Sequence, residues 1–207
     1  MPPDADPIPE SQLRSLPGVY ALADSGHIDV WSSGDSLMIG ALDATSIAVL
    51  AGHDSSAARR AAELSERATT FLAMLGSDSA AQEFMHASIP ADARRAYVST
   101  LRRSLGDSVA RDVTVIGTAI DSPVAARSFV RVMRNGASEF VSLIWSGGML
   151  VGVEPAGRAA YTLRLRSESP GALASFDLFT GHLVRVELLG DRALGIESNG
   201  VTRRAVR

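Results

Sequence analysis

The chain has 207 residues, of which 46% are hydrophobic, and it carries a formal net charge of -3 with a pI near 5.8. This balance supplies enough apolar side chains for a packed core and no basic footprint for nucleic acid, whose binding depends on neutralising phosphates. The sequence has no cysteine, and all 20 of its basic residues are arginine, which excludes disulfides, cysteine-ligated zinc, a phosphate-loop lysine and a Schiff-base lysine.

Residues 1–17 are rich in proline and acidic side chains, with five prolines and three acids. A secretory signal peptide begins with positive charge followed by an apolar segment, and neither is present here. This composition predicts a flexible linker and indicates that the chain is a piece of a longer protein.

Residues 18–54 alternate short apolar runs with turn residues, which predicts an antiparallel meander. Within 27–31, Ile28 and Val30 share one face of a strand, and Trp31 lies on the other. Trp31 is therefore expected at the surface, where it is a candidate interface residue.

No apolar run reaches the ~18 residues of a membrane span. The four strands are predicted at 18–23, 27–31, 36–40 and 46–50.

Residues 55–105 show helical periodicity. One stripe of apolar side chains, which predicts the buried face of the first helix, contains Leu64, Ala68, Phe71, Leu72 and Leu75. Gly76 ends that helix. The three helices are predicted at 55–74, 79–85 and 89–105.

The rest of the chain returns to strands. Asn135-Gly136 between two alternating runs is a strong hairpin signal. Four strands are predicted at 112–118, 128–134, 138–145 and 149–153, and five more at 160–166, 174–179, 183–188, 193–197 and 201–206. The side chains expected to form one core with the helices are Phe129, Val130, Val132, Phe140, Leu143 and Trp145.

The stretch 55–156 resembles the cone-shaped domains of the nuclear-transport-factor-like, or ketosteroid-isomerase-like, family. Three helices followed by segments 113–118, 128–132 and 140–152 carry this resemblance. It implies a curved antiparallel sheet wrapped around a pocket for an apolar small molecule. Isomerase chemistry there needs a buried carboxylate base and an oxyanion donor such as tyrosine.

The flanks resemble a small β-rich domain found C-terminal to serine β-lactamase-like hydrolases. Segments 16–22 and 28–39 are similar to its opening, and 183–206 is similar to its ending. The resemblance implies that the cone (55–156) is inserted in, or flanked by, a β-domain split into 18–54 and 157–207. In the inserted arrangement the two ends of the chain pair, while a tandem order remains the alternative.

The four histidines lie in separate segments without metal-ligand spacing, so we expect no metal and no cofactor. His53, with Asp54, is a candidate corner of an acid–base site, although a surface turn is the favoured interpretation. His86, near the expected mouth of the cone, is the best single candidate for a ligand contact. No Gly-x-Ser-x-Gly nucleophile elbow occurs.

Three further side chains are candidates for the pocket. Tyr97 is the only tyrosine within the cone segment, and Asp112, Asp121 and Glu139 are the acids that could approach it. Trp145 ends an alternating strand and is expected to plug the cone. The enzyme hypothesis requires a desolvated carboxylate beside Tyr97, whereas a pocket filled by Trp145 and leucines favours a scaffold.

An arginine band on the third helix consists of Arg94, Arg95, Arg102 and Arg103. Eight residues turn about 80° beyond two full circles, so the two pairs form a broad band rather than a line. The simplest interpretation is a solvent-exposed helix face. The more specific interpretation is a patch that docks an acidic partner.

Taken together, the sequence predicts an α+β chain that acts as a non-catalytic accessory module of a larger exported protein. The implied partner is an upstream hydrolase-like catalytic domain of the same parent chain. Export is implied by the resemblance alone. A small-molecule isomerase or cyclase and a homodimerisation module are the alternatives.

Overall fold

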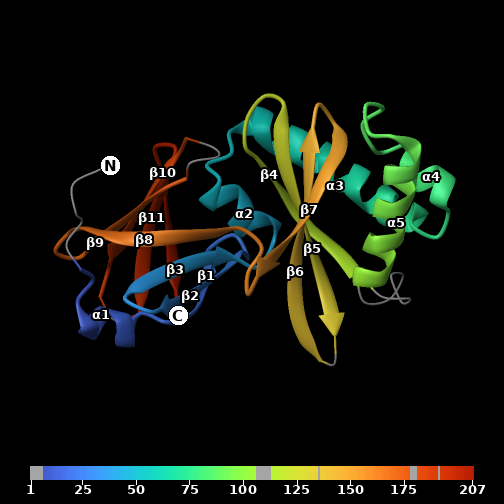
Figure 1. Ribbon diagram of the computed structural model, residues 1–207. Coiled ribbons are helices and arrows are strands. Elements are labelled where there is room, and N and C mark those ends of the chain that lie inside the picture. Colours follow the sequence, from blue (N-terminus) through green and yellow to red (C-terminus); the bar gives the residue numbers. More distant parts are fainter. Residues whose placement is uncertain (1–6, 106–112, 135, 178–180, 191) are drawn as a thin grey trace. The chain divides into compact units, whose positions relative to one another are not determined.

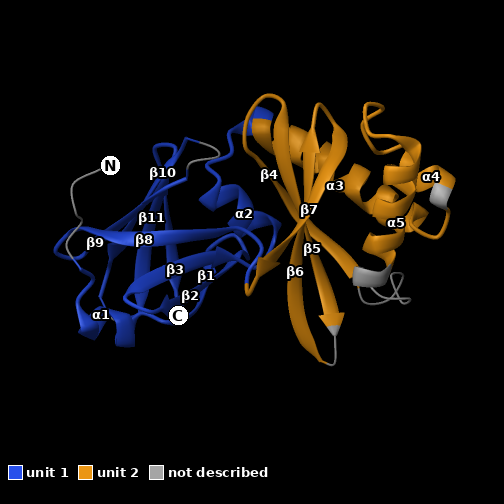
Figure 2. Ribbon diagram, viewed as in Figure 1, with its two compact units in different colours: residues 1–56, 159–207 blue, residues 57–158 orange. Residues whose placement is uncertain are grey.

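The computed structural model describes residues 7–105, 113–134, 136–177, 181–190 and 192–207 (Figure 1). The fold is α+β, and it combines a closed eight-stranded antiparallel β-barrel with a four-stranded antiparallel sheet that carries helices. Two compact units divide the chain: unit 1 contains residues 1–56 and 159–207, and unit 2 contains residues 57–158 (Figure 2). Among the described residues, no helix has both the length and the apolar character needed to cross a membrane.

The barrel of unit 1 is assembled from both ends of the chain. β1 pairs with β12 through Ala21 and Val206, and β3 pairs with β8 through Ile39 and Leu163. These two seams close the barrel in the order β1-β12-β11-β10-β9-β8-β3-β2. Its strands are β1 (Gly18–Leu22), β2 (His27–Ser33), β3 (Ser36–Ala41), β8 (Thr162–Ser169), β9 (Ala172–Phe176), β10 (Leu183–Leu188), β11 (Ala193–Ser198) and β12 (Val201–Val206).

The barrel interior is filled by alternate side chains of its strands. Ile28 and Val30 are buried, as their alternation predicts, and Leu37 and Ile39 face them from the neighbouring strand. The interior is therefore a packed core. Side chains of the other strands that are also buried include Tyr20, Leu163, Leu165, Leu173, Val184, Val186, Leu194, Ile196 and Ala205.

The segment predicted as a linker contains a short helix in its described part. Residues 10–15 form a short helix, α1 (Glu10–Ser15), and the flanking Ile8 and Leu16 are only 7% and 4% exposed. The hydroxyl of Tyr20 donates to the backbone oxygen of Leu16 at 2.7 Å. Ile8 and Leu16 therefore anchor this segment, while the helix between them has no buried residue.

The predicted fourth strand, 46–50, is wrong, because it is part of helix α2 (Ala44–Leu50). Asp43 and Ser46 form a reciprocal capping box: the Asp43 carboxylate accepts from the Ser46 backbone N–H at 2.9 Å, and the Ser46 hydroxyl accepts from the Asp43 N–H at 3.1 Å. Ile47 and Leu50 are fully buried. The cap outweighs the strand preference of the β-branched side chains.

Unit 2 places helices against one face of its sheet. The predicted stripe on α3 is confirmed, because all five of its side chains are buried in the shared core. The helices are α3 (Ser55–Met74), α4 (Asp78–Gln82) and α5 (Ala91–Leu105), and the strands, which pair in chain order, are β4 (Val113–Ile120), β5 (Ala125–Arg134), β6 (Ala137–Ser146) and β7 (Met149–Gly157).

The predicted core of the sheet is only partly correct. Val130, Val132, Leu143 and Trp145 do join the helices in one core. Phe129 and Phe140 are buried, but they lie outside this core. Successive side chains of a strand point to opposite faces, so Phe129 cannot share the face of Val130. Arg134 at the end of β5 pairs with Ala137 at the start of β6, as the predicted hairpin requires, while Asn135 of its turn lies outside the described residues.

Candidate functional site

Trp145 lies in the centre of the unit 2 core. Its side chain is 1% exposed, and its indole N–H donates to the hydroxyl of Ser128 at 2.8 Å. That hydroxyl is 2.7 Å from the hydroxyl of Thr118, which is in turn 2.8 Å from that of Ser65 on α3. Trp145 therefore closes a buried polar chain and serves the packing of the core.

Tyr97 packs its ring against the same core from α5. Its hydroxyl oxygen is buried, with no hydrogen-bond partner among the described residues. Burial, reinforced by the carboxylate of Glu154, raises the pKa of Tyr97 to about 12. The hydroxyl is therefore neutral at physiological pH and available as a hydrogen-bond donor.

The acid that raises the pKa of Tyr97 is not one of the three that were predicted to approach it. Glu154, on β7, is exposed, and it was not among the predicted site residues. Asp121 makes a two-point ion pair with Arg127, with the two shortest N–O distances 2.7 and 2.9 Å. Asp112 lies outside the described residues. Isomerase chemistry requires a buried, unpaired carboxylate base. Asp121 is paired and Glu154 is exposed, so neither of them matches this requirement.

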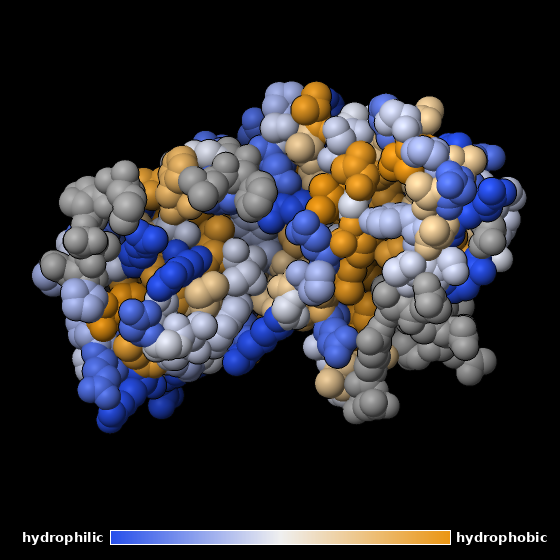
Figure 3. All heavy atoms as spheres, viewed as in Figure 1, coloured by the Kyte–Doolittle hydropathy of each residue, from blue (hydrophilic) through white to orange (hydrophobic). Residues whose placement is uncertain are grey.

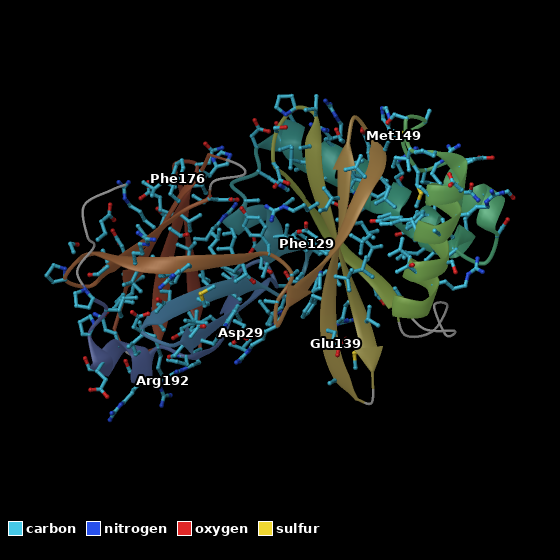
Figure 4. All side chains as sticks on the ribbon, viewed as in Figure 1. Asp29, Phe129, Glu139, Met149, Phe176 and Arg192 are labelled. Carbon is cyan, nitrogen blue, oxygen red and sulfur yellow. The ribbon has the colours of Figure 1, made fainter. Side chains whose placement is uncertain are left out.

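His86 and Glu139 are both exposed. His86 follows Met85, which forms an isolated β-bridge with Leu150 near the start of β7. The ring Nδ1 of His86 is 2.6 Å from the hydroxyl of Ser88. Glu139 lies near the opposite end of the sheet from Met149 (Figure 4). The residues expected to line one pocket are therefore spread over unit 2.

Trp31 lies on the outer face of β2 and is partly buried, rather than standing free at the surface. Its ring covers Gly40 on β3: a methyl group added to this glycine would lie 2.9 Å from a ring carbon. Gly40 therefore provides the flat surface on which the indole rests.

An arginine hollow forms on unit 2 between the end of α3, α4 and α5. Its volume is about 750 Å³, and its lining residues are Gly76, Ser79, Gln82, Glu83, Arg94, Arg95 and Arg102. The structure therefore brings together three of the four predicted arginines, with Glu83 as the acidic side chain among the described lining residues. The side chain of Arg103 is outside the described part of the chain.

Two of these arginines have different roles. Arg102 donates its Nε to the backbone oxygen of Leu75 at 2.8 Å, and its Nη2 donates to the same oxygen. It therefore satisfies a carbonyl at the end of α3. Arg94 is partly buried, and its Nε has no partner among the described residues. An enclosed donor without a partner destabilises the protein, so Arg94 favours an added acceptor.

Figure 3 shows where apolar atoms gather on the visible face of unit 2, which is over β7 and beside it toward α5. Val151 on β7 is 43% exposed, and Val153 is partly buried against the helical core. The arginine hollow is thus a separate, polar feature of the unit.

A second hollow, of about 450 Å³, lies in unit 1 beside α2 and includes His53, Asp54, Ser198 and Asn199 in its lining. Of these residues, only His53 with Asp54 was predicted as a candidate site. Ser198 and Asn199 were not predicted as site residues. Among the described residues, no cluster of three or more histidine or acidic side chains could hold a metal ion.

Comparison with known proteins gives no relative for this chain. No family model, no curated protein and no solved structure matches it. The two hollows and the filled core are therefore the observations from which a function can be argued.

Proposed function

We propose that the chain is a non-catalytic accessory module that binds an acidic partner through the arginine hollow. The observation that carries the proposal is the convergence of Arg94, Arg95 and Arg102 on one hollow, in which Arg94 also has a buried Nε without a hydrogen-bond partner among the described residues. A guanidinium presents its donors in a planar fork, which matches the two oxygens of a carboxylate.

The filled core of unit 2 supports a role without catalysis. In this proposal the four-stranded sheet and its helices are a cone of the nuclear-transport-factor-like type, inserted into the split β-domain. Trp145, Leu143 and Leu150 occupy the interior that an isomerase of this shape would leave open for substrate. A buried polar chain fixes Trp145 in place, so opening the cone would break it.

The partner is, in this proposal, an acidic surface of an upstream serine-hydrolase-like domain of an exported parent chain. This part rests on the resemblance of the flanking strands to the domain that follows such hydrolases. The full reading frame of the gene tests it: an upstream domain with a Ser-x-x-Lys motif supports the assignment, and a frame without one contradicts it.

The binding experiment compares two charge-matched double variants. R94Q/R95Q removes two cations from the hollow, whereas R59Q/R131Q removes two exposed cations elsewhere in unit 2. Arg102 is left intact because it caps α3. Fluorescence anisotropy with a labelled hexaglutamate peptide measures the affinity at low and at moderate salt.

We expect R94Q/R95Q to weaken peptide binding at least tenfold, on the order of 1.4 kcal/mol, and R59Q/R131Q to change it less than about twofold. Wild-type affinity should fall as salt rises, because exposed charges are screened. Equal loss in both variants, or no binding by the wild type at low salt, contradicts the proposal.

A second candidate function, an isomerase- or cyclase-like activity, is favoured by the neutral, enclosed hydroxyl of Tyr97 beside Glu154. It requires the core around Trp145 to open and admit an apolar substrate. Homodimerisation is a third candidate, and sedimentation velocity measures it directly: a concentration-independent monomer excludes it.

A further inference from the structure

The second hollow lies at one end of the barrel, within unit 1. Helix α2, the segment that follows it and the turn between β11 and β12 contribute most of its wall. Its lining residues are Asp24, Thr45, Ala48, Val49, Gly52, His53, Asp54, Ser198, Asn199, Val201 and Arg203. With a volume of about 450 Å³, it is within the range of small-molecule sites.

Ser198 provides the buried polar group of this hollow. It continues the inward-facing row of Leu194 and Ile196 on β11, and it is 4% exposed. Its hydroxyl oxygen is buried without a hydrogen-bond partner among the described residues. A buried hydroxyl in this state costs stability, so the position favours a bound molecule that supplies the missing hydrogen bond.

Gly52 keeps the space beside this hydroxyl open. Its φ is +64°, and a Cβ there would lie 2.8 Å from the Ser198 oxygen and 3.4 Å from Nδ1 of His182. Asn199, also left-handed with φ +52°, donates its side-chain amide to the Gly52 oxygen at 3.0 Å. Two left-handed residues joined by a hydrogen bond therefore hold the wall in a conformation that most side chains disfavour.

The charges of the lining residues indicate which ligand fits. Asp24 and Asp54 supply two carboxylates, and Arg203 supplies one guanidinium. Burial lowers the pKa of His53, Asp54 opposes this shift and His182 reinforces it. The imidazole is therefore neutral near pH 7, and the lining favours a cation or a zwitterion over an anion.

We propose that this hollow binds a small organic ammonium compound of amino-acid size. Its ammonium group pairs with Asp24, near the second negative charge of Asp54, its apolar part packs against Val49 and Val201, and a polar group meets the hydroxyl of Ser198. This site is in unit 1, so it is independent of the arginine hollow and of the acidic partner proposed for it.

Three probes of one size and different charge test the ligand class on the full chain. They are L-leucinamide, L-leucine and 4-methylpentanoate, followed by amide chemical-shift changes in nuclear magnetic resonance spectra. We expect saturable shifts at Gly52, His53 and Asn199 with the two amines and none with the carboxylate. Absence of saturable shifts with both amines, or equal binding of 4-methylpentanoate, overturns the proposal.

Two variants and one control locate the site. D24N removes a lining carboxylate, and S198A removes the unpartnered hydroxyl; D35N changes a turn aspartate of the same unit that does not line the hollow. We expect D24N and S198A each to weaken leucinamide binding at least about threefold, and D35N to leave it unchanged. Because S198A leaves no unmet hydrogen bond, its thermal stability should be retained. Wild-type affinity in both D24N and S198A overturns the assignment.

Discussion

The indole N–H of Trp145 donates to the hydroxyl of Ser128, 2.8 Å away, and this bond connects β6 to β5 inside the core of unit 2. Thr118 extends the connection to β4, and Ser65 extends it to α3. Four elements therefore share one short chain of polar atoms, buried except for its partly buried end at Ser65, and this chain fixes how the helix lies on the sheet.

Replacement of Ser128 by alanine should break this chain at its centre. It leaves the indole N–H of Trp145 and the hydroxyl of Thr118 with one partner fewer. We expect a loss of about 1–3 kcal/mol in the free energy of unfolding, measured by urea denaturation. S146A, at the exposed end of β6, is the control and should change it by less than about 0.5 kcal/mol. Equal effects of the two substitutions contradict the proposed role.

Tyr97 and Tyr161 give opposite predictions for the loss of a hydroxyl. The Tyr97 hydroxyl has no partner among the described residues, so Y97F should leave stability unchanged or raise it by up to about 1 kcal/mol. The Tyr161 hydroxyl donates to the buried carboxylate of Asp177, so Y161F should lose about 1–3 kcal/mol. Thermal melting compares both with the wild type, and a large loss in Y97F would show that its hydroxyl has a structural partner.

The ultraviolet titration of the phenols adds a second measurement on Tyr97. Its pKa of about 12 places its ionisation above the ordinary range of tyrosine. We expect the difference between the titrations of the wild type and Y97F, followed near 295 nm, to show a component near pH 12. A component near pH 10 would mean that the hydroxyl is open to water.

His53 should make the protein less stable in mild acid. Burial lowers its pKa in the folded state, with Asp54 opposing and His182 reinforcing the shift; Asp24 and Arg203 line the same hollow. The unfolded chain, with an ordinary pKa of about 6.5, therefore binds more protons as the pH falls below that value. The stability that a neutral His53 contributes is fully present above about pH 6.5 and is lost as the pH falls toward its folded pKa.

Urea denaturation at pH 7 and pH 5 measures this effect. H53Q should lose less stability than the wild type over this range, and H86Q, which alters an exposed histidine of unit 2, should follow the wild type. The same pH dependence in all three proteins would exclude His53 as its source.

Gly40 should not tolerate a side chain. An added methyl group would meet the ring of Trp31 at 2.9 Å and the side chain of Ala159. We expect G40A to lose about 1–3 kcal/mol in the free energy of unfolding, because overpacking forces the ring to move. G76A is the control, since open space surrounds that glycine. The fluorescence maximum of Trp31 should shift in G40A, and an unchanged spectrum with full stability would be evidence against this contact.

Local patterns in the sequence predicted the elements better than their assembly. The stripe on α3 follows from a period of 3.6, which is why every member proves to be buried. The alternation of side chains along a strand correctly placed Ile28 and Val30 on the buried face. The predicted core of the sheet did not apply this alternation, because it placed the neighbours Phe129 and Val130 on the same face. For α2, the capping box of Asp43 and Ser46 was present in the sequence, but the prediction of a strand at 46–50 did not take it into account.

The hollows could not be predicted, because they depend on residues that meet only in the folded chain. Gly52 and Asn199, which share a hydrogen bond, are 147 positions apart. Each occurs in a segment that, by itself, indicates only a turn. The arginine band was visible as a helix face, but the hollow beside it also requires α4, which local periodicity does not position.

The divided barrel has a consequence for the order in which the protein folds during synthesis. Unit 2 is continuous in sequence and can fold as soon as it leaves the ribosome. By contrast, β1 cannot pair with β12 until the last residues of the chain have been synthesised. Meanwhile β1, β2 and β3 expose the apolar faces that later line the barrel interior. Synthesis of the intervening residues therefore imposes a delay during which β1, β2 and β3 are vulnerable to misassociation. Folding of unit 2 in that interval shortens the span that the two halves of the barrel must close.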